Sequence, residues 1–168
     1  LRKTDFTCRC PQPLPSCWRE RPGVADWWHD KPLAELSVAE WDALCDGCAK
    51  CCLHKVEDED SAEVYYTKVR CRYLKERTCR CTSYQNRTTL VPDCIDLRLA
   101  DWESIDWLPS TCAYRLRARG ELLPQWHPLV SGNPESVHAE GISIRGRSIS
   151  EEFVHSDGFE EFIVHWVE

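Results

Sequence analysis

Four of the chain's cysteines fall within residues 45–52, a density that no hydrophobic core requires. Cys45 and Cys48 are separated by two residues, and Gly47 between them supplies the positive φ that lets a short turn bring both sulfurs toward one centre. The side chains of the neighbours Cys51 and Cys52 point in different directions, so this pair does not readily close a disulfide on itself. The spacing therefore predicts a metal site, in which the pair serves two metals or two corners of one cluster.

A second group of thiols follows between residues 71 and 112, and arginines are interleaved with it. The cysteines are Cys71, Cys79, Cys81, Cys94 and Cys112, and the arginines are Arg70, Arg72, Arg77, Arg80 and Arg87. Cationic neighbours lower the pKa of a thiol and offset the charge of a thiolate-rich centre. This is the pattern that a loaded metal site needs, although a plain alternation of surface charge would look similar.

Two interpretations compete for the thiols, which number 12 in 168 residues. An even count in an oxidising compartment indicates a disulfide framework, whereas clustered cysteines in the cytosol indicate metal. The first residues contain no apolar run typical of a secretory signal, and no stretch of about 18 apolar residues could span a membrane. We therefore expect a cytoplasmic protein with reduced, metal-bound cysteines and no membrane partner, and we keep the disulfide-stapled domain as an alternative.

The charge and the missing motifs exclude several other functions. The formal net charge is −7, which argues against a nucleic-acid partner because phosphate binding needs an excess of Lys and Arg. Neither a P-loop, nor a dinucleotide-binding glycine motif, nor a serine nucleophile elbow occurs.

A helix over residues 38–45 is expected to position the first thiols. Ser37 and Glu40 form the pattern of a capping box, which marks the start of a helix. The side chains at helical spacing are Val38, Trp41, Leu44 and Cys45. We expect this stripe to be buried and to aim Cys45 inward.

The remaining elements are predicted to be short. Residues 53–69 read as a hairpin around the acidic run 57–60, which is expected to be a solvated turn rather than a calcium loop. Further helices are expected at 98–106 and at 111–119, the latter with Ser110 as its cap and Gly120 as its stop, and residues 142–145 alternate like a strand.

Together these elements predict an α+β fold: one small, loop-rich, metal-stabilised domain with short helices and a small hairpin. We expect residues 1–23, with Cys8, Cys10 and Cys17, to be an irregular Pro-rich extension. Residues 24–150 then form the cysteine-rich metal-binding domain. Residues 151–168 are apolar enough to dock on that domain or on a protein partner.

The motif Cys45-x-x-Cys48-x-x-Cys51-Cys52 resembles the signature of the YkgJ-type family of zinc- or iron-chelating proteins, and most closely its YcgN branch of bacterial proteins. The similarity covers roughly residues 27–150. Further matching stretches are Leu53-His54-Lys55, Glu57-Asp58-Glu59-Asp60, Tyr65-Tyr66-Thr67, Thr78-Cys79-Arg80-Cys81, Pro92-Asp93-Cys94, Thr111-Cys112-Ala113-Tyr114-Arg115 and Trp126-His127-Pro128-Leu129.

The resemblance implies metal binding in a bacterial cytoplasmic protein, and it implies nine thiols as candidate ligands. These are Cys45, Cys48, Cys51, Cys52, Cys71, Cys79, Cys81, Cys94 and Cys112. One closed zinc site takes four ligands, so nine fit two such sites with one spare, or a multinuclear centre. The usual ferredoxin spacing is absent, so zinc, iron and an iron–sulfur cluster all stay open.

Three functions follow, in order of preference. The first is a protein that holds zinc or an iron or iron–sulfur centre and that folds partly through the metal. The second is a metal- or iron–sulfur-dependent redox enzyme, which would need acid–base groups near the metal. The candidates for these groups are His54, His127, His138 and Tyr84. The third is the disulfide-stapled domain.

Overall fold

The computed structural model describes residues 26–102 and 105–167, and the expectations for residues 1–23 lie outside this range. The α-helices are α1 (Trp27–Asp30), α2 (Val38–Leu44), α3 (Arg87–Leu90), α4 (Ala113–Ala118), α5 (Pro128–Ser131) and α6 (Ser136–Ala139). The strands are β1 (Leu53–Glu57), β2 (Val64–Arg70), β3 (Leu74–Lys75), β4 (Arg80–Cys81) and β5 (Ile149–Ser150). The 3-10 helices are η2 (Leu33–Glu35), η3 (Lys50–Cys52), η4 (Tyr84–Asn86), η5 (Glu151–Phe153) and η6 (Ser156–Phe162).

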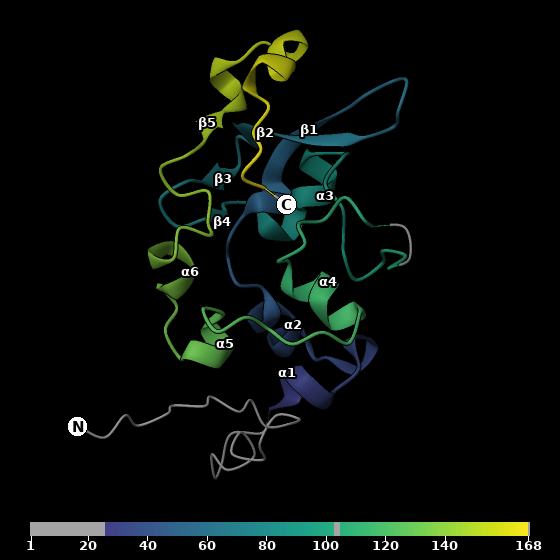
Figure 1. Cartoon of the computed structure of the whole chain (residues 1–168), viewed down its shortest axis with the longest axis vertical. Coiled ribbons are helices and arrows are strands. Elements are labelled where there is room, and N and C mark those ends of the chain that lie inside the picture. Colours follow the sequence, from purple (N-terminus) through teal and green to yellow (C-terminus); the bar gives the residue numbers. More distant parts are fainter. Residues whose placement is uncertain (1–25, 103–104, 168) are drawn as a thin grey trace, which may run out of the picture.

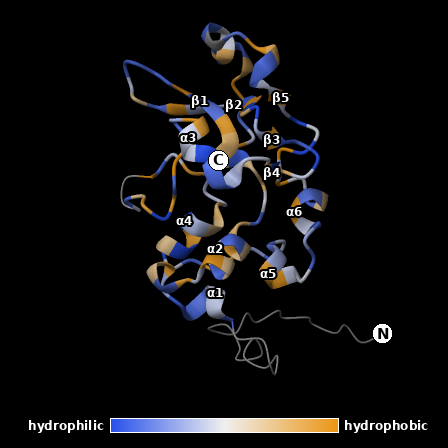
Figure 2. Ribbon diagram, turned by 180° about the vertical axis from the view of Figure 1, so that it is seen from behind, coloured by the Kyte–Doolittle hydropathy of each residue, from blue (hydrophilic) through white to orange (hydrophobic). Residues whose placement is uncertain are grey.

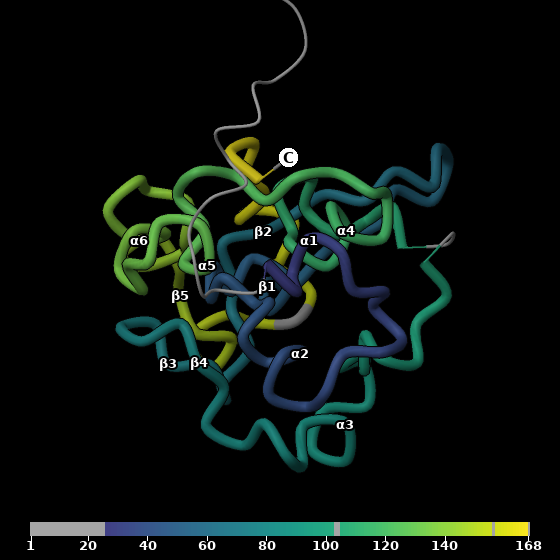
Figure 3. Tube along the Cα trace, turned by 90° about the horizontal axis from the view of Figure 1, so that it is seen from below, coloured from purple at the N-terminus to yellow at the C-terminus, as the bar shows by residue number. Residues whose placement is uncertain are grey.

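The molecule has a helical end and a sheet end. Figure 1 shows α1, α2, α4 and α5 at one end, and β1, β2 and β5 with the C-terminal 3-10 helices at the other. Seen from the helical end in Figure 3, α5 and α6 lie on one side and α3 lies at a different edge.

The larger sheet has the order β1-β2-β5, and β3 and β4 form a separate two-stranded sheet. β1 and β2 are antiparallel, whereas β5 runs parallel to β2 and pairs Ile149 with Val69. The C-terminal segment returns to the same sheet: Ile163 bridges to Thr67, and the N–H of Val164 donates to the carbonyl of Tyr66 at 2.8 Å.

Each end has its own apolar core. The helical core consists of Leu36, Trp41, Leu44, Ala113, Tyr114 and Leu123. The sheet core consists of Ala49, Leu53, Tyr66, Leu74, Cys79 and Ile144. Trp27 and Trp28 cover the helical core, and Trp166 with its neighbours covers the sheet core. Hydropathy colouring in Figure 2 shows apolar residues in α2 and α4, whereas the tip of the β1–β2 hairpin is hydrophilic.

The predicted fold class is confirmed, because the chain is a small α+β structure with short helices, a small sheet and many cysteines. The capping box is also confirmed: the Ser37 side chain accepts from the N–H of Glu40, and the Glu40 carboxylate accepts from the N–H of Ser37. The hairpin forms, and its acidic turn is fully exposed over residues 57–63.

The predicted helix at 98–106 is wrong for the residues described, 98–102 and 105–106, which form turns. The N–H of Leu99 donates to the carbonyl of Asp96, and Leu99 is 86% exposed while Leu97 and Trp102 pack on the helical core. A spacing of five between the inward residues does not match the 3.6-residue period of a helix.

Three smaller expectations are also wrong. Residues 142–145 form no strand, and the neighbours Ser143 and Ile144 are both buried instead of alternating. Helix α4 starts at Ala113 with Cys112 as its cap residue, so Ser110 caps nothing. Val38 is 67% exposed, so the buried face of α2 is made by Trp41 and Leu44 alone.

Within the part of the chain that the structure describes, none of the helices has the length and apolar character needed to cross a membrane.

Candidate metal centre

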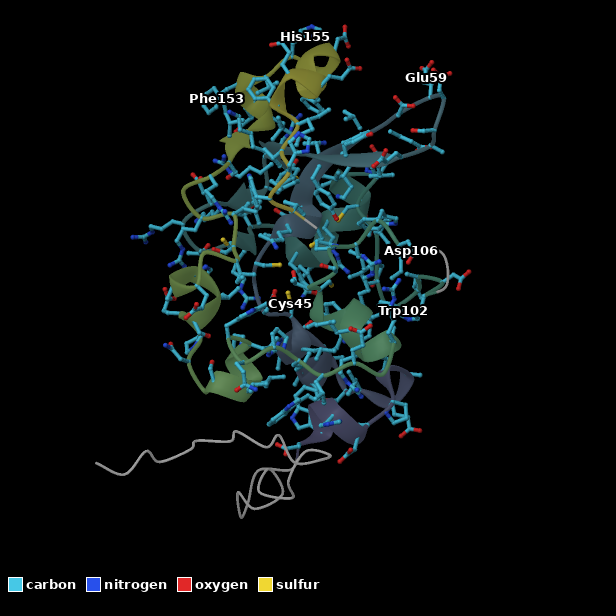
Figure 4. All side chains as sticks on the ribbon, viewed as in Figure 1. Cys45, Glu59, Trp102, Asp106, Phe153 and His155 are labelled. Atoms are coloured by element: carbon cyan, nitrogen blue, oxygen red, sulfur yellow. The ribbon has the colours of Figure 1, made fainter. Side chains whose placement is uncertain are left out.

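A cavity of about 520 Å³ lies between the two cores, and all nine candidate cysteines line it. Its other walls come from both ends: Trp41 and Tyr114 belong to the helical core, and Leu53 and Leu74 belong to the sheet core. Figure 4 shows sulfur atoms in the middle of the molecule, at the level of Cys45 and above it. Thiols separated by up to 67 positions in the sequence, from Cys45 to Cys112, thus meet in one place.

The first two thiols are positioned by the end of α2 and by a tight turn. Cys45 is the residue that ends α2, and the Asp46 side chain then accepts the N–H of Cys48 at 2.9 Å. Gly47 has φ 77°, a conformation that glycine adopts without strain. The carbonyl of Cys48 accepts the N–H of Ile144 at 3.0 Å, so the turn is anchored to the sheet core.

The adjacent cysteines sit in the short helix η3, which the chain enters through Ala49 in a left-handed conformation, with φ 61°. The sulfurs of Cys51 and Cys52 are 4.0 Å apart, about twice the length of a disulfide bond. The N–H of Cys71 donates to the carbonyl of Cys52 at 3.1 Å, which brings the thiol after β2 alongside this pair.

The later thiols sit in turns and at element ends. Cys79 adopts a positive φ of 50° before β4, and Cys81 lies in β4 itself. The N–H of Cys94 donates to the carbonyl of Val91 at 2.9 Å in the turn after α3, and Cys112 is the cap residue of α4. All nine are free thiols, so the disulfide alternative receives no support from the described residues.

Burial makes most of these thiols harder to ionise than a thiol in water. Desolvation raises the pKa of Cys45 and of Cys112 to about 12, and the nearby Asp46 carboxylate adds to the shift at Cys45. The same cause raises the pKa of Cys48, Cys71 and Cys94. Without a metal, these sulfurs hold their protons.

Cys51 differs from the others. A hydrogen bond with the Cys52 thiol and, to a smaller extent, the nearby cation of Lys55 lower the pKa of Cys51 to about 7. The same hydrogen bond, together with desolvation, raises the pKa of Cys52. The two neighbouring thiols thus differ in how readily they ionise.

Lys55 is a cation held in place beside the thiols. Its Nζ donates to the carbonyls of Cys51 and Leu53 at 3.1 and 2.9 Å, and it lies 4.9 Å from the ring centroids of both Tyr66 and Trp107. Burial lowers the pKa of Lys55, and the nearby thiols oppose that shift. Sequence reasoning did not assign Lys55 a role, although it lies in one of the matching motifs.

Of the four candidate acid–base residues, the three histidines are hydrogen-bonded to other protein groups, and two of these histidines do not line the cavity. His54 lines the cavity, but its Nε2 is paired with Glu151. The Nδ1 of His127 accepts the N–H of Leu129 at 3.1 Å, so its Nε2 donates to the carbonyl of Leu44 at 3.0 Å. His138 bonds to Ser143 at 2.8 Å, and neither His127 nor His138 is among the residues that line the cavity. Tyr84 lines it and is 45% exposed.

Among the described residues, no three cysteine, histidine, aspartate or glutamate side chains are already grouped closely enough to hold one metal ion. The nine thiols share a cavity, and the rotation of their side chains would have to complete any ligand set. A small α+β chain with nine free thiols around one cavity belongs to the class of cysteine-rich proteins.

Comparison with known proteins agrees with this class. Residues 44–113 match the CxxCxxCC family, described as "Putative zinc- or iron-chelating domain". A UPF0260 protein of Rhizobium johnstonii is 53% identical over 140 residues, covering 83% of this chain and 89% of the relative. A UPF0260 protein of Rhizobium meliloti is 50% identical over 144 residues, which cover 86% of this chain and 93% of the relative. A UPF0260 protein of Granulibacter bethesdensis is 53% identical over 140 residues, which cover 83% of each chain. The chain belongs to the UPF0260 family. No solved structure matches it.

Proposed function

We propose that this protein chelates zinc or iron through thiolates of the nine cysteines that line the central cavity. The observation that carries the proposal is their convergence: nine free thiols from residues 45–52 and from the segment 71–112 line one cavity, and the described residues contain no disulfide. The description of the matching family, a zinc- or iron-chelating domain, supports the same chemistry.

The donor set suits these metals. Thiolates are soft ligands that favour zinc and iron–sulfur centres over magnesium or calcium. The charged groups that line the cavity besides the thiols are the cations Lys55, Arg80 and Arg87 and the carboxylates Asp46 and Asp93. One excess positive charge cannot offset several buried thiolates, so ionisation of the set requires metal cations in the cavity.

The size of the cavity favours more than one metal atom. A volume of about 520 Å³ is an order of magnitude above the roughly 30 Å³ that one water occupies in the liquid. Nine thiols also exceed the four ligands of one closed zinc site. Two four-ligand sites with one spare thiol, or one multinuclear centre, both use this space.

The metal would also link the two ends of the molecule. Cys45 and Cys112 pack against the helical core, whereas Cys52 and Cys79 belong to or pack against the sheet core. A centre that binds thiolates from both groups joins two cores that the chain otherwise connects through loops. Metal binding then contributes directly to the stability of the fold.

The test is metal analysis of the full chain purified without oxygen, combined with its visible absorption spectrum and a thiol titration after denaturation. We expect at least one zinc or iron per chain, colour if iron–sulfur is present, and free thiols after metal removal. Cys48→Ser and Cys52→Ser should each lower the metal content, whereas Cys17→Ser, outside the matching region, should leave it unchanged. A metal-free protein that folds with all thiols reduced and takes up neither zinc nor iron would overturn the proposal.

A further inference from the structure

One buried oxygen in the wall of the cavity has no hydrogen-bond partner. Asp46 is only 5% exposed, and its Oδ1 accepts the N–H of Cys48 at 2.9 Å. Its Oδ2 is buried and bonds to nothing in the described part of the chain, and no ion pair of the described residues includes it. Burying a carboxylate oxygen without a partner is costly, so native proteins rarely leave one in this state.

The other unpartnered buried atoms in the described residues have an ordinary explanation. They are the Nε atoms of Arg115 and Arg145, whose guanidinium groups bond through other nitrogens to the carbonyl of Leu108 and, at 2.8 Å, to Glu135. Asp46 is different, because its orphaned atom is an acceptor with a negative charge and because Asp46 lines the cavity of the nine thiols.

The turn that carries Asp46 is built to hold it. Asp46 lies between Cys45 and Cys48, and the bond from its Oδ1 to the second of these fixes the direction of the carboxylate. Gly47 follows in a left-handed conformation, and the Arg80 guanidinium lies against it, 3.4 Å from where a Cβ would be. The backbone of the turn thus fixes the orientation of the Asp46 carboxylate through the hydrogen bond from the N–H of Cys48.

We propose that Asp46 Oδ2 is an oxygen ligand of the metal centre, beside the thiolates of the cysteines that flank it. This inference rests on the proposed function. The cation that ionises the thiols also supplies the missing partner of the carboxylate. Zinc is bound in proteins both by cysteine sulfur and by carboxylate oxygen. The metal at this position then has a mixed set of sulfur and oxygen ligands.

X-ray absorption at the metal edge tests this directly on the full chain loaded with zinc under anaerobic, reducing conditions. We expect an oxygen scatterer at about 2.0–2.2 Å in addition to sulfur at about 2.3 Å. Asp46→Asn keeps an oxygen to accept the N–H of Cys48 but removes the charged ligand. It should lose the oxygen scatterer and weaken zinc binding, measured by competition with a chelator, by about tenfold or more.

Asp93→Asn is the matched control, because Asp93 also lines the cavity but is exposed. It should leave both the spectrum and the affinity unchanged. A wild-type spectrum with sulfur alone would overturn the assignment of Asp46 and leave the proposed function standing, and this measurement needs no variant to fold. An oxygen scatterer that persists in Asp46→Asn would also overturn it. A wild-type chain that binds no zinc or iron would overturn the proposed function itself.

Discussion

The two ends of the molecule are held together by different means. In the helical core, the rings of Trp41 and Tyr114 pack with centroids 4.6 Å apart and planes tilted by 31°, and the Tyr114 hydroxyl donates to the Trp41 carbonyl at 2.8 Å. A capped helix and the fully buried His127 complete this end. The sheet end has less regular structure and a smaller apolar contribution to its core. Strands β3, β4 and β5 have two residues each, and one of the core side chains is the thiol of Cys79.

The contrast is sharpest in the segment between Cys71 and Cys112, which supplies five of the nine thiols. Its described residues form two short strands, the 3-10 helix η4, the four-residue helix α3 and turns, and neither helix has a buried residue. Ordering the backbone of such a segment costs conformational entropy, and the segment buries too little apolar surface to offset that cost. We infer that the helical end is stabilised by ordinary packing, whereas the sheet end and this segment depend on what fills the cavity.

Removal of the metal should give the largest effect. Structural zinc contributes apparent free energies of folding of about 10–16 kcal/mol in small zinc domains. Its loss should therefore unfold the regions that have little apolar packing of their own, which are the sheet end and the segment between Cys71 and Cys112. After chelation under reducing conditions, hydrogen exchange should speed up over residues 45–57 and 71–112, while α2 and α4 stay protected. Equal exchange in loaded and stripped protein, or loss of protection everywhere, would contradict the comparison.

Truncating one leucine in each core tests the same comparison between the two ends. Leu44 and Leu53 are 0% and 2% exposed, in the helical and the sheet core respectively, and each replacement by Ala should cost about 2–5 kcal/mol in the loaded protein. In the stripped protein, Leu44→Ala should keep its cost and Leu53→Ala should lose most of it, because the sheet end is already open. Urea unfolding followed by tryptophan fluorescence and by circular dichroism measures both. Val38→Ala, on the exposed face of α2, is the control and should stay within about 0.5 kcal/mol.

The same contrast explains what could be predicted from the sequence. Local signals in the helical end are strong: the capping box at Ser37 and the inward Trp41 and Leu44 agree with the structure. The hairpin follows from its own alternation and turn. The failures at 98–106 and 142–145 lie where no local rule decides, because these segments are shaped by long-range contacts such as the bond from Ile144 to Cys48.

The candidate site was predictable in its residue types but not in its arrangement. Cysteine spacing and the family resemblance identify all nine thiols that line the cavity. Sequence reasoning assigned no role to Asp46 or Lys55, because a single aspartate or lysine carries no pattern. Only the structure shows that Asp46 has a buried oxygen without a partner and that Lys55 contacts two carbonyls and two aromatic rings.

His127 should make the helical end sensitive to acid. Burial lowers the pKa of His127, and the Leu44 carbonyl and Asp46 offset this only in part. Below about pH 6.5, the unfolded histidine therefore takes up a proton that the folded one refuses, and stability falls as the pH falls. The slope should reach at most about 1.4 kcal/mol per pH unit. Urea unfolding of the stripped protein between pH 7.5 and 5.5 measures it without interference from thiolate–metal bonds.

His127→Gln removes the titrating group while keeping a side chain that can donate to the Leu44 carbonyl. This variant should be less stable at neutral pH and should lose the part of the slope that His127 supplies. A wild-type protein whose helical end gains stability as the pH falls, or a variant with an unchanged slope, would show that His127 does not titrate in this way.

The smallest expected effect tests where the helices of this end begin. Ser37→Ala removes the acceptor for the Glu40 N–H at the start of α2, and a lost N-cap costs about 1 kcal/mol. Ser110→Ala is the matched control, because Ser110 is exposed and α4 begins at Ala113 without it. Since Cys45 is the C-cap residue of α2, the first replacement should also weaken zinc binding slightly, whereas the second should change neither stability nor affinity. Equal costs for the two serines would mean that α4 starts earlier than the structure shows, and that the helical end is ordered by the sequence signal at 110 after all.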